Sequence, residues 1–148
     1  MAKGQGLVTS DLRRIELGLP SVLFKRVRHV VEENERVRRM VDGLQTEEPA
    51  AVGRLLTESH ASLRDLYQVS IPEIDFLVDA GLKRGAVGAR IMGGGFGGVT
   101  LHLVPTEFLE RFGDEVVEAY TREFGLTALV IPVVPGAGAR QRVEEMGR

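Results

Sequence analysis

Apolar residues recur every three or four positions in the first half of the chain, which is the spacing of one face of an α-helix. One such stripe runs from Leu23 to Leu44, and charged residues fill most positions between its members. We expect a long amphipathic helix that lies on the core of the domain. The alternative, a coiled coil, is less favoured because few heptads follow. The stripe consists of Leu23, Val27, Val30, Asn34, Val37, Val41 and Leu44.

Two further helices are expected before residue 85. The first starts near Thr46–Pro49, where acidic residues and a proline suit a first turn, and its apolar stripe runs from Val52 to Leu66. The second starts at Ser70. There Ser70-Ile71-Pro72-Glu73 fits a capping box, in which a serine and a glutamate bind free backbone N–H groups.

Beyond Gly85 the pattern becomes rich in β-forming residues. Strands are expected at Val87–Met92 and Val99–Val104, followed by a helical stripe from Phe108 to Phe124 that Gly125 ends. A last β-rich run covers Thr127–Val134, with Pro132 placing part of it at a sheet edge.

This order of elements predicts an α+β fold, a ferredoxin-like α/β sandwich with helices packed on one face of a small antiparallel sheet. The chain of 148 residues has the size of one domain. Residues 1–18 are expected to be a loosely ordered leader and residues 19–148 the domain, since the first residues are small and polar without a period.

Composition removes several classes of function. The 19 basic and 21 acidic residues nearly balance, which argues against nucleic-acid or membrane-surface partners. The absence of cysteine excludes disulfides, thiolate catalysis and cysteine-bound zinc, and favours a cytoplasmic location. No apolar run approaches the roughly 20 residues that a membrane span requires.

Five glycines crowd the run Gly93-Gly94-Gly95-Phe96-Gly97-Gly98. The letters contain G-x-G-x-x-G, but a Rossmann site needs a helix after the run, and a strand pattern follows here. A P-loop is excluded because no Gly-Lys-Ser/Thr closes the run. We expect a turn between two strands with several glycines at positive φ and amides that face an anion or ligand. A tight structural turn is the alternative.

Other polar residues give weaker signals. Arg90 could add positive charge for a phosphate, or could simply be a strand-edge arginine. Ser59 and Asn34 fit helix crossings better than chemistry. Ser59 and His60 point about 100° apart on a helix, so they cannot pair directly. His29 is expected to be solvated, and the three histidines are too scattered for a metal site.

Three segments carry a family resemblance. The run Gly88–Gly98 (GARIMGGGFGG) resembles the third motif of the GHMP small-molecule kinases, with a phenylalanine as in galactokinases. The segment from Glu58 to Asp75 resembles the galactokinase pattern S-H-x-S-L-x-x-x-Y-x-V-S-x-P-E-x-D. Arg28–Asn34 is similar to the R-H-V-x-x-E-N helix of bacterial galactokinases. The resemblance covers about residues 19–140.

The resemblance implies the C-terminal half of a galactokinase-type sugar kinase. Such an enzyme phosphorylates galactose or a related sugar at C1 with ATP and Mg²⁺, and Gly93–Gly98 would line its nucleotide and sugar cleft. Arg90, Ser59 and His60 are possible supporting residues. No catalytic residue or metal ligand is assigned in this chain. Val99 departs from the family, where many relatives have cysteine.

The N-terminal half of such kinases, with its phosphate loop and catalytic aspartate, has no counterpart here. The chain alone is therefore expected to be inactive. Its expected partners are that missing half, or a second copy bound through the exposed interdomain face. The alternative function is a non-catalytic binding or regulatory module built on the same fold.

Overall fold

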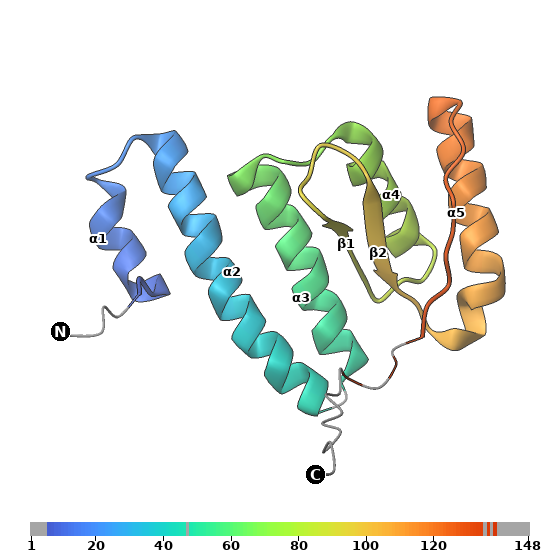
Figure 1. The fold of residues 1–148 in the computed structure, drawn as a ribbon, viewed down its shortest axis with the longest axis horizontal. Coiled ribbons are helices and arrows are strands. Elements are labelled where there is room, and N and C mark those ends of the chain that lie inside the picture. The colour runs from blue at the N-terminus through green and yellow to red at the C-terminus, as the bar shows by residue number, and fades with distance from the viewer. Residues whose placement is uncertain (1–5, 47, 135, 137, 139–148) are drawn as a thin grey trace, which may run out of the picture.

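The computed structural model describes residues 6–46, 48–134, 136 and 138. Within them, helices precede and follow one pair of antiparallel strands, which confirms the α+β class (Figure 1). Every helix and strand expected up to residue 124 is present, with bounds shifted by a few residues. The elements are α1 (Leu12–Glu16), α2 (Ser21–Gln45), α3 (Pro49–Ser62), α4 (Pro72–Lys83), β1 (Gly88–Met92), β2 (Val99–Leu103) and α5 (Leu109–Phe124).

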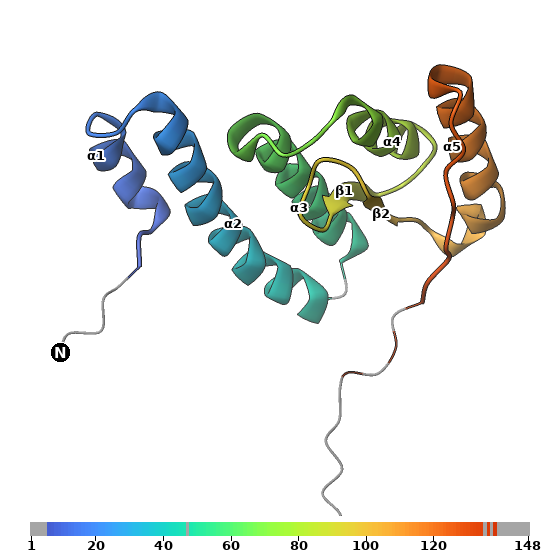
Figure 2. The same cartoon turned by 45° about the horizontal axis from the view of Figure 1, so that its top comes forward.

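The first three helices lie side by side (Figures 1 and 2). Residues 9–16, which were expected to belong to a loose leader, form a short 3-10 turn and α1. Leu12 of α1 is buried, and α1 contacts α2. Part of the expected leader is therefore helical, while the boundary of the domain stays a prediction.

The apolar core lies where α4 covers one face of the strand pair and α5 packs beside α4. Ala89 and Ile91 of β1 are fully buried on that face. Close packing of α4 on the same face requires Gly81, since a Cβ there would lie 2.2 Å from Nδ1 of His102. Phe112, Val116 and Tyr120 of the α5 stripe are buried in this core, and α5 ends at Gly125 in the left-handed conformation, as predicted.

Helix α3 covers the outer edge of β1. The N–H of Ala89 donates to Oγ1 of Thr57 (3.3 Å), and the N–H of Ile91 donates to Nδ1 of His60 (3.4 Å). The backbones approach so closely that a Cβ on Gly53 would lie 2.1 Å from the carbonyl oxygen of Val87. Side chains of α3 therefore satisfy an edge that would otherwise be open to pairing.

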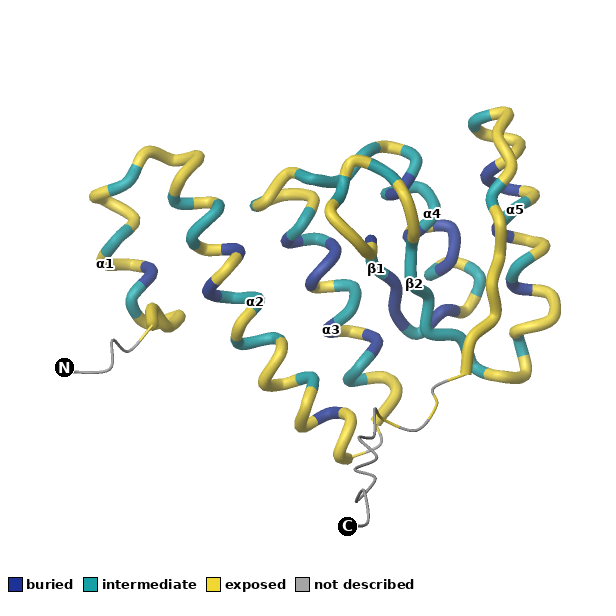
Figure 3. The backbone as a smooth tube through the Cα atoms, in the orientation of Figure 1, coloured by how far each residue is buried: buried dark blue, intermediate teal, exposed yellow. Residues whose placement is uncertain are grey.

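The predicted inner face of α2 is wrong. The stripe from Leu23 to Leu44 faces solvent, and the buried residues of α2 are His29, Val31 and Gly43. Figure 3 shows mostly exposed and intermediate backbone along α2, with few buried positions. The physical reason is that polar side chains of α2, not its apolar stripe, contact α3.

The predicted strand at residues 127–134 is also wrong. The segment leaves the end of α5 and runs back beside that helix (Figures 1 and 2). The side chain of Val130 lies against Gly113, where a Cβ would be 3.1 Å from Cγ1 of Val130. The segment packs on α5 instead of pairing with β2, and Pro132 has no N–H to donate. Within the described residues the sheet therefore has two strands.

Candidate functional site: the glycine loop and its supports

The glycine run forms the turn that joins β1 to β2, as predicted. Phe96 has a φ of 60°, a left-handed conformation that costs a residue with a side chain about 1 kcal/mol or more. Phe96 is 72% exposed, so burial within this chain does not offset that cost. The other loop residues at positive φ are Gly93, Gly95, Gly97 and Gly98.

The loop is fixed on the backbone of Val69. The N–H of Phe96 donates to the Val69 carbonyl over 2.7 Å. A Cβ on Gly95 would lie 2.6 Å from both Cβ and the carbonyl oxygen of Val69, so only glycine fits there. Within the described residues, no partner binds the N–H groups of the five loop glycines. Those groups are available to a ligand or to another protein segment.

Val69 is itself held by the turn that ends α3. Its N–H donates to the carbonyl of Leu63 (3.1 Å), in a π-helical turn spanning Leu63–Tyr67. Gln68 closes that turn in the left-handed conformation, with φ at 61°. Arg26 of α2 donates to the Leu66 carbonyl and, over 2.8 Å, to Oε1 of Gln68. Helix α2 thus supports the loop through this turn.

His29 takes part in the same support, and its predicted exposure is wrong. The side chain is buried, its Nδ1 lies 2.9 Å from Oγ of Ser62, and its ring stacks on Tyr67 with centroids 4.6 Å apart. Burial lowers the pKa of His29 below its usual value. His29 was expected in solvent because it lies next to Arg26 and Arg28, but this side of α2 packs against α3.

His60 forms a second support between α3, β1 and α4. Its Nδ1 accepts the Ile91 N–H, and its Nε2 lies 3.2 Å from Oδ1 of Asp75. Burial lowers the pKa of His60, and the charge of Asp75 only partly opposes this, so the ring is neutral at neutral pH. Oγ of Ser70 donates to the same Asp75 oxygen over 2.5 Å. Ser70 adjoins Val69, so this group also fixes the segment that holds the loop.

That contact replaces the predicted capping box. Helix α4 begins at Pro72 with Ile71 as its N-cap, and no side chain caps it. The box is wrong because Ser70 lies one residue too early and binds Asp75 instead.

Glu33 forms a third support, which joins α2, α3 and β1. Its Oε1 accepts from Oγ of Ser59 (2.6 Å) and its Oε2 from Nε of Arg36 (2.8 Å). Arg90 lies 3.6 Å from Oε1 and donates through Nε to the Ile91 carbonyl. Burial favours a raised pKa for Glu33, but the hydrogen bonds from Ser59 and Arg36, with the two arginine charges, outweigh it and lower the pKa.

Ser59 therefore lies at a helix crossing, as predicted. Arg90 is held by Glu33, and its contact with a phosphate stays a prediction. Ser59 and His60 contact different neighbours and act apart. Sequence reasoning did not single out Glu33 or Asp75, although both stand at lettered positions of the resemblance, the E of R-H-V-x-x-E-N and the D of P-E-x-D.

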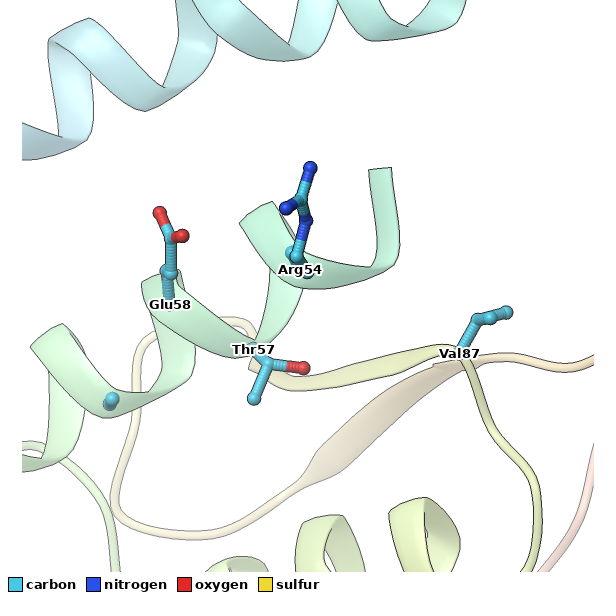
Figure 4. A pocket seen from close by; sticks show the side chains of 5 residues that line it. Arg54, Thr57, Glu58 and Val87 are labelled. Carbon is cyan, nitrogen blue, oxygen red and sulfur yellow. The ribbon is translucent and has the colours of Figure 1, made fainter. Parts of the chain in front are cut away.

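A pocket between α3 and the start of β1 does not belong to this site. Figure 4 shows Arg54 and Glu58 pointing from α3 toward α2, Thr57 pointing toward the strands, and Val87 on the segment that leads into β1. The glycine loop follows the opposite end of β1. The pocket is lined by Arg54, Thr57, Glu58, Ala61 and Val87.

Among the described residues, no group of three His, Asp or Glu side chains is arranged to hold a metal ion. The helices of that same part of the chain are too short or too polar to cross a membrane.

Comparison with known families identifies the class of protein. The family model described as "GHMP kinases C terminal" matches residues 40–122, more than half of the chain. The chain belongs to the GHMP kinase family and corresponds to its C-terminal region. Galactokinases are among its curated relatives.

The galactokinase of Streptomyces coelicolor is 42% identical over 127 residues, which are 86% of this chain and 33% of that protein. The galactokinase of Thermotoga maritima is 41% identical over 132 residues, 88% of this chain and 37% of that protein. The chain thus spans about a third of the length of these relatives.

Two solved kinase structures have folds similar to that of this chain. Lactococcus lactis galactokinase complexed with galactose superposes with a TM-score of 0.77 at 33% identity, over 82% of this chain and 32% of that one. L. major mevalonate kinase in complex with R-mevalonate gives a TM-score of 0.55 at 24% identity, over 78% of this chain and 33% of that one, which shows the fold alone.

Proposed function

We propose that the chain is the C-terminal part of a galactokinase-type enzyme that transfers the γ-phosphate of ATP to galactose or a related sugar. In this reaction the C1 hydroxyl oxygen attacks the γ-phosphorus, the bond to ADP breaks, and the hydroxyl proton leaves to a base. The Gly93–Gly98 loop lines the cleft where nucleotide and sugar meet. In the complete enzyme we expect the ferredoxin-like sandwich that the order of elements predicts.

The observation that carries this proposal is the loop itself. Its backbone is held in an unfavourable conformation by Val69, and its glycine amides have no partner within the described residues. A purely structural turn needs neither a strained Phe96 nor this many free N–H groups. Free backbone amides in a glycine-rich turn suit the stabilisation of phosphate charge.

The residues of the glycine loop fit one side of an ATP site. The free amides of Gly93–Gly98 would face phosphate oxygens. In the part of the chain that the structure describes, no group of three His, Asp or Glu side chains is arranged to hold a metal ion. In this proposal the Mg²⁺ ligands come from the rest of the kinase. We expect the isolated chain to be inactive.

A chimera tests the proposal. The matching region of Thermotoga maritima galactokinase is replaced by this chain, and galactose-dependent ADP release is measured beside the isolated chain. We expect activity from the chimera alone, and a Gly97→Val chimera to lose at least tenfold in kcat/KM for ATP while its Tm falls by only a few degrees. A folded chimera without phosphotransfer, or one indifferent to Gly97→Val, contradicts the proposal.

A further inference from the structure

Helix α2 presents an apolar surface that no part of the described chain covers. This surface, the α2 stripe, consists of the exposed residues Leu23, Val30, Asn34, Val37, Val41 and Leu44, of which the apolar ones are 50–62% exposed. It extends for about 32 Å, given a rise of 1.5 Å per residue. Contiguous exposed apolar residues of this extent mark an interaction surface.

The period of the α2 stripe limits what can cover it. Spacings of four and three repeat through the helix. They place Val27, Asn34 and Val41 in one row, and Leu23, Val30, Val37 and Leu44 in the other. This is the pattern that packs against another helix or a sheet face. A small ligand or a nucleic acid would need polar or basic groups here, and the stripe offers one amide.

A second copy of the chain fits the stripe poorly. In a paired coiled coil, charges in the rows beside the stripe select the partner. On α2 the positions beside the stripe already make contacts within this chain. Val31 is buried, Glu33 binds Ser59, and Arg38 pairs with Glu35 of its own helix over 2.9 Å.

The remainder of a galactokinase-type kinase fits better. About two thirds of each curated relative lies outside the region matched by this chain, and the matching family model is the C-terminal one. The first described residues lie beside this helix, since the turn Thr9–Asp11 contacts α2 (Figure 1). A preceding segment of such a kinase would therefore reach the chain next to the stripe.

We propose that the α2 stripe docks an apolar helix or sheet face from the N-terminal part of a galactokinase-type kinase. The proposal rests on the proposed function for the identity of the partner. It also explains why the face of α2 toward α3 is polar. Arg26, His29 and Glu33 support the glycine loop from one side of the helix, while the stripe holds the other part of the enzyme from another. Docking would then place the loop opposite the nucleotide.

The test compares Val37→Glu in the isolated chain and in the Thermotoga maritima chimera, with Ala50→Glu as the control. Ala50 is exposed on α3 and receives the same carboxylate on a different helix. In the isolated chain we expect both variants to melt within about 2 °C of the parent, because both positions already face solvent. In the chimera we expect Val37→Glu to separate one melting transition into two and to reduce phosphotransfer at least tenfold, with Ala50→Glu unchanged.

The outcomes separate the two proposals. A chimera that melts as one unit, and in two steps with Val37→Glu, supports docking even if it transfers no phosphate. An active chimera whose melting and rate ignore Val37→Glu overturns docking and leaves the proposed function intact. Should the isolated chain dimerise through Val37 while the chimera ignores the substitution, the stripe joins two copies and the proposal is wrong. If the chimera is insoluble, capture of the co-expressed N-terminal part by the parent chain but not by Val37→Glu decides the question.

Discussion

Helices α2 and α5 carry the same sequence pattern and end in opposite environments. Both have an apolar stripe at helical spacing beside charged residues. On α5 the stripe residues Phe112, Val116 and Tyr120 are 5–8% exposed, because α4 packs against this helix and His102 of β2 lies beside Phe112. On α2 the equivalent residues face solvent. A periodic stripe therefore predicts a buried face, but the element that buries it need not lie in the same chain.

The two helices should differ most in the free energy of unfolding that one acidic substitution costs on each. Val116→Asp should cost about 4 kcal/mol or more, since it places a charge in a dry core. Val37→Asp should stay within about 0.5 kcal/mol, since the carboxylate remains in water. Urea unfolding of both variants of the isolated chain measures the difference. Equal losses would mean that the two stripes are equally buried.

The glycine loop, like the stripe of α5, depends on a contact within this chain, the close approach of Gly95 to Val69. Gly95→Val should cost roughly 2–3 kcal/mol, because it places Cβ against Val69 and adopts a φ of 92°. Gly94→Ala is the control, because that glycine has a negative or extended φ and open space around it. Thermal melting of the isolated chain checks the pair. Similar melting temperatures for both variants would show that Val69 does not fix the loop.

Acid should weaken the core beside α5. Burial, with a smaller effect from the charge of His60, lowers the pKa of His102 to about 4, below the 6.5 of the unfolded chain. The unfolded state therefore takes up the proton first, and stability present above pH 6.5 is lost as the pH falls toward 4. We expect a loss of roughly 2 kcal/mol between pH 7 and pH 5, to which His29 and His60 add in the same direction.

Urea unfolding across this pH range measures the loss, and His102→Leu should flatten the profile. An unchanged slope in that variant would assign the titration to other groups.

The smallest expected effect concerns the support of the loop by His60. His60→Leu should cost about 1–2 kcal/mol, because the Ile91 N–H loses its acceptor inside the protein. His60→Gln can still accept that bond and should recover part of the loss. Amide exchange at Phe96 distinguishes this role from general stability, since His60→Leu should speed it more than global unfolding allows. Exchange at the global rate would remove the link to the loop.

Sequence reasoning located most elements because their patterns are local. Gly125 after an apolar stripe ended α5 as expected, and the glycine run between β-rich segments formed the expected turn. The predictions failed where burial or strand pairing depended on which other element a segment packs against. The stripe of α2 was assigned to the core, His29 was expected in solvent, and Thr127–Val134 was expected to pair although it lies on α5.

The candidate site shows the same division. The loop could be predicted from its glycine density alone, since so many glycines at one place indicate backbone demand. Its supports could not. Glu33 meets Ser59, and His60 meets Asp75, only after α2, α3 and α4 pack together, and no spacing along the chain predicts such contacts.

The central claim is that the stripe of α5 is satisfied within this chain and the stripe of α2 only by the rest of a galactokinase-type kinase. Covalent side-chain footprinting of the isolated chain and the chimera tests it in one measurement. We expect Val116 and Tyr120 to be protected in both proteins, and Val37, Val41 and Leu44 to be labelled in the isolated chain and protected in the chimera. Labelling of the α2 stripe to the same extent in both proteins would contradict the account.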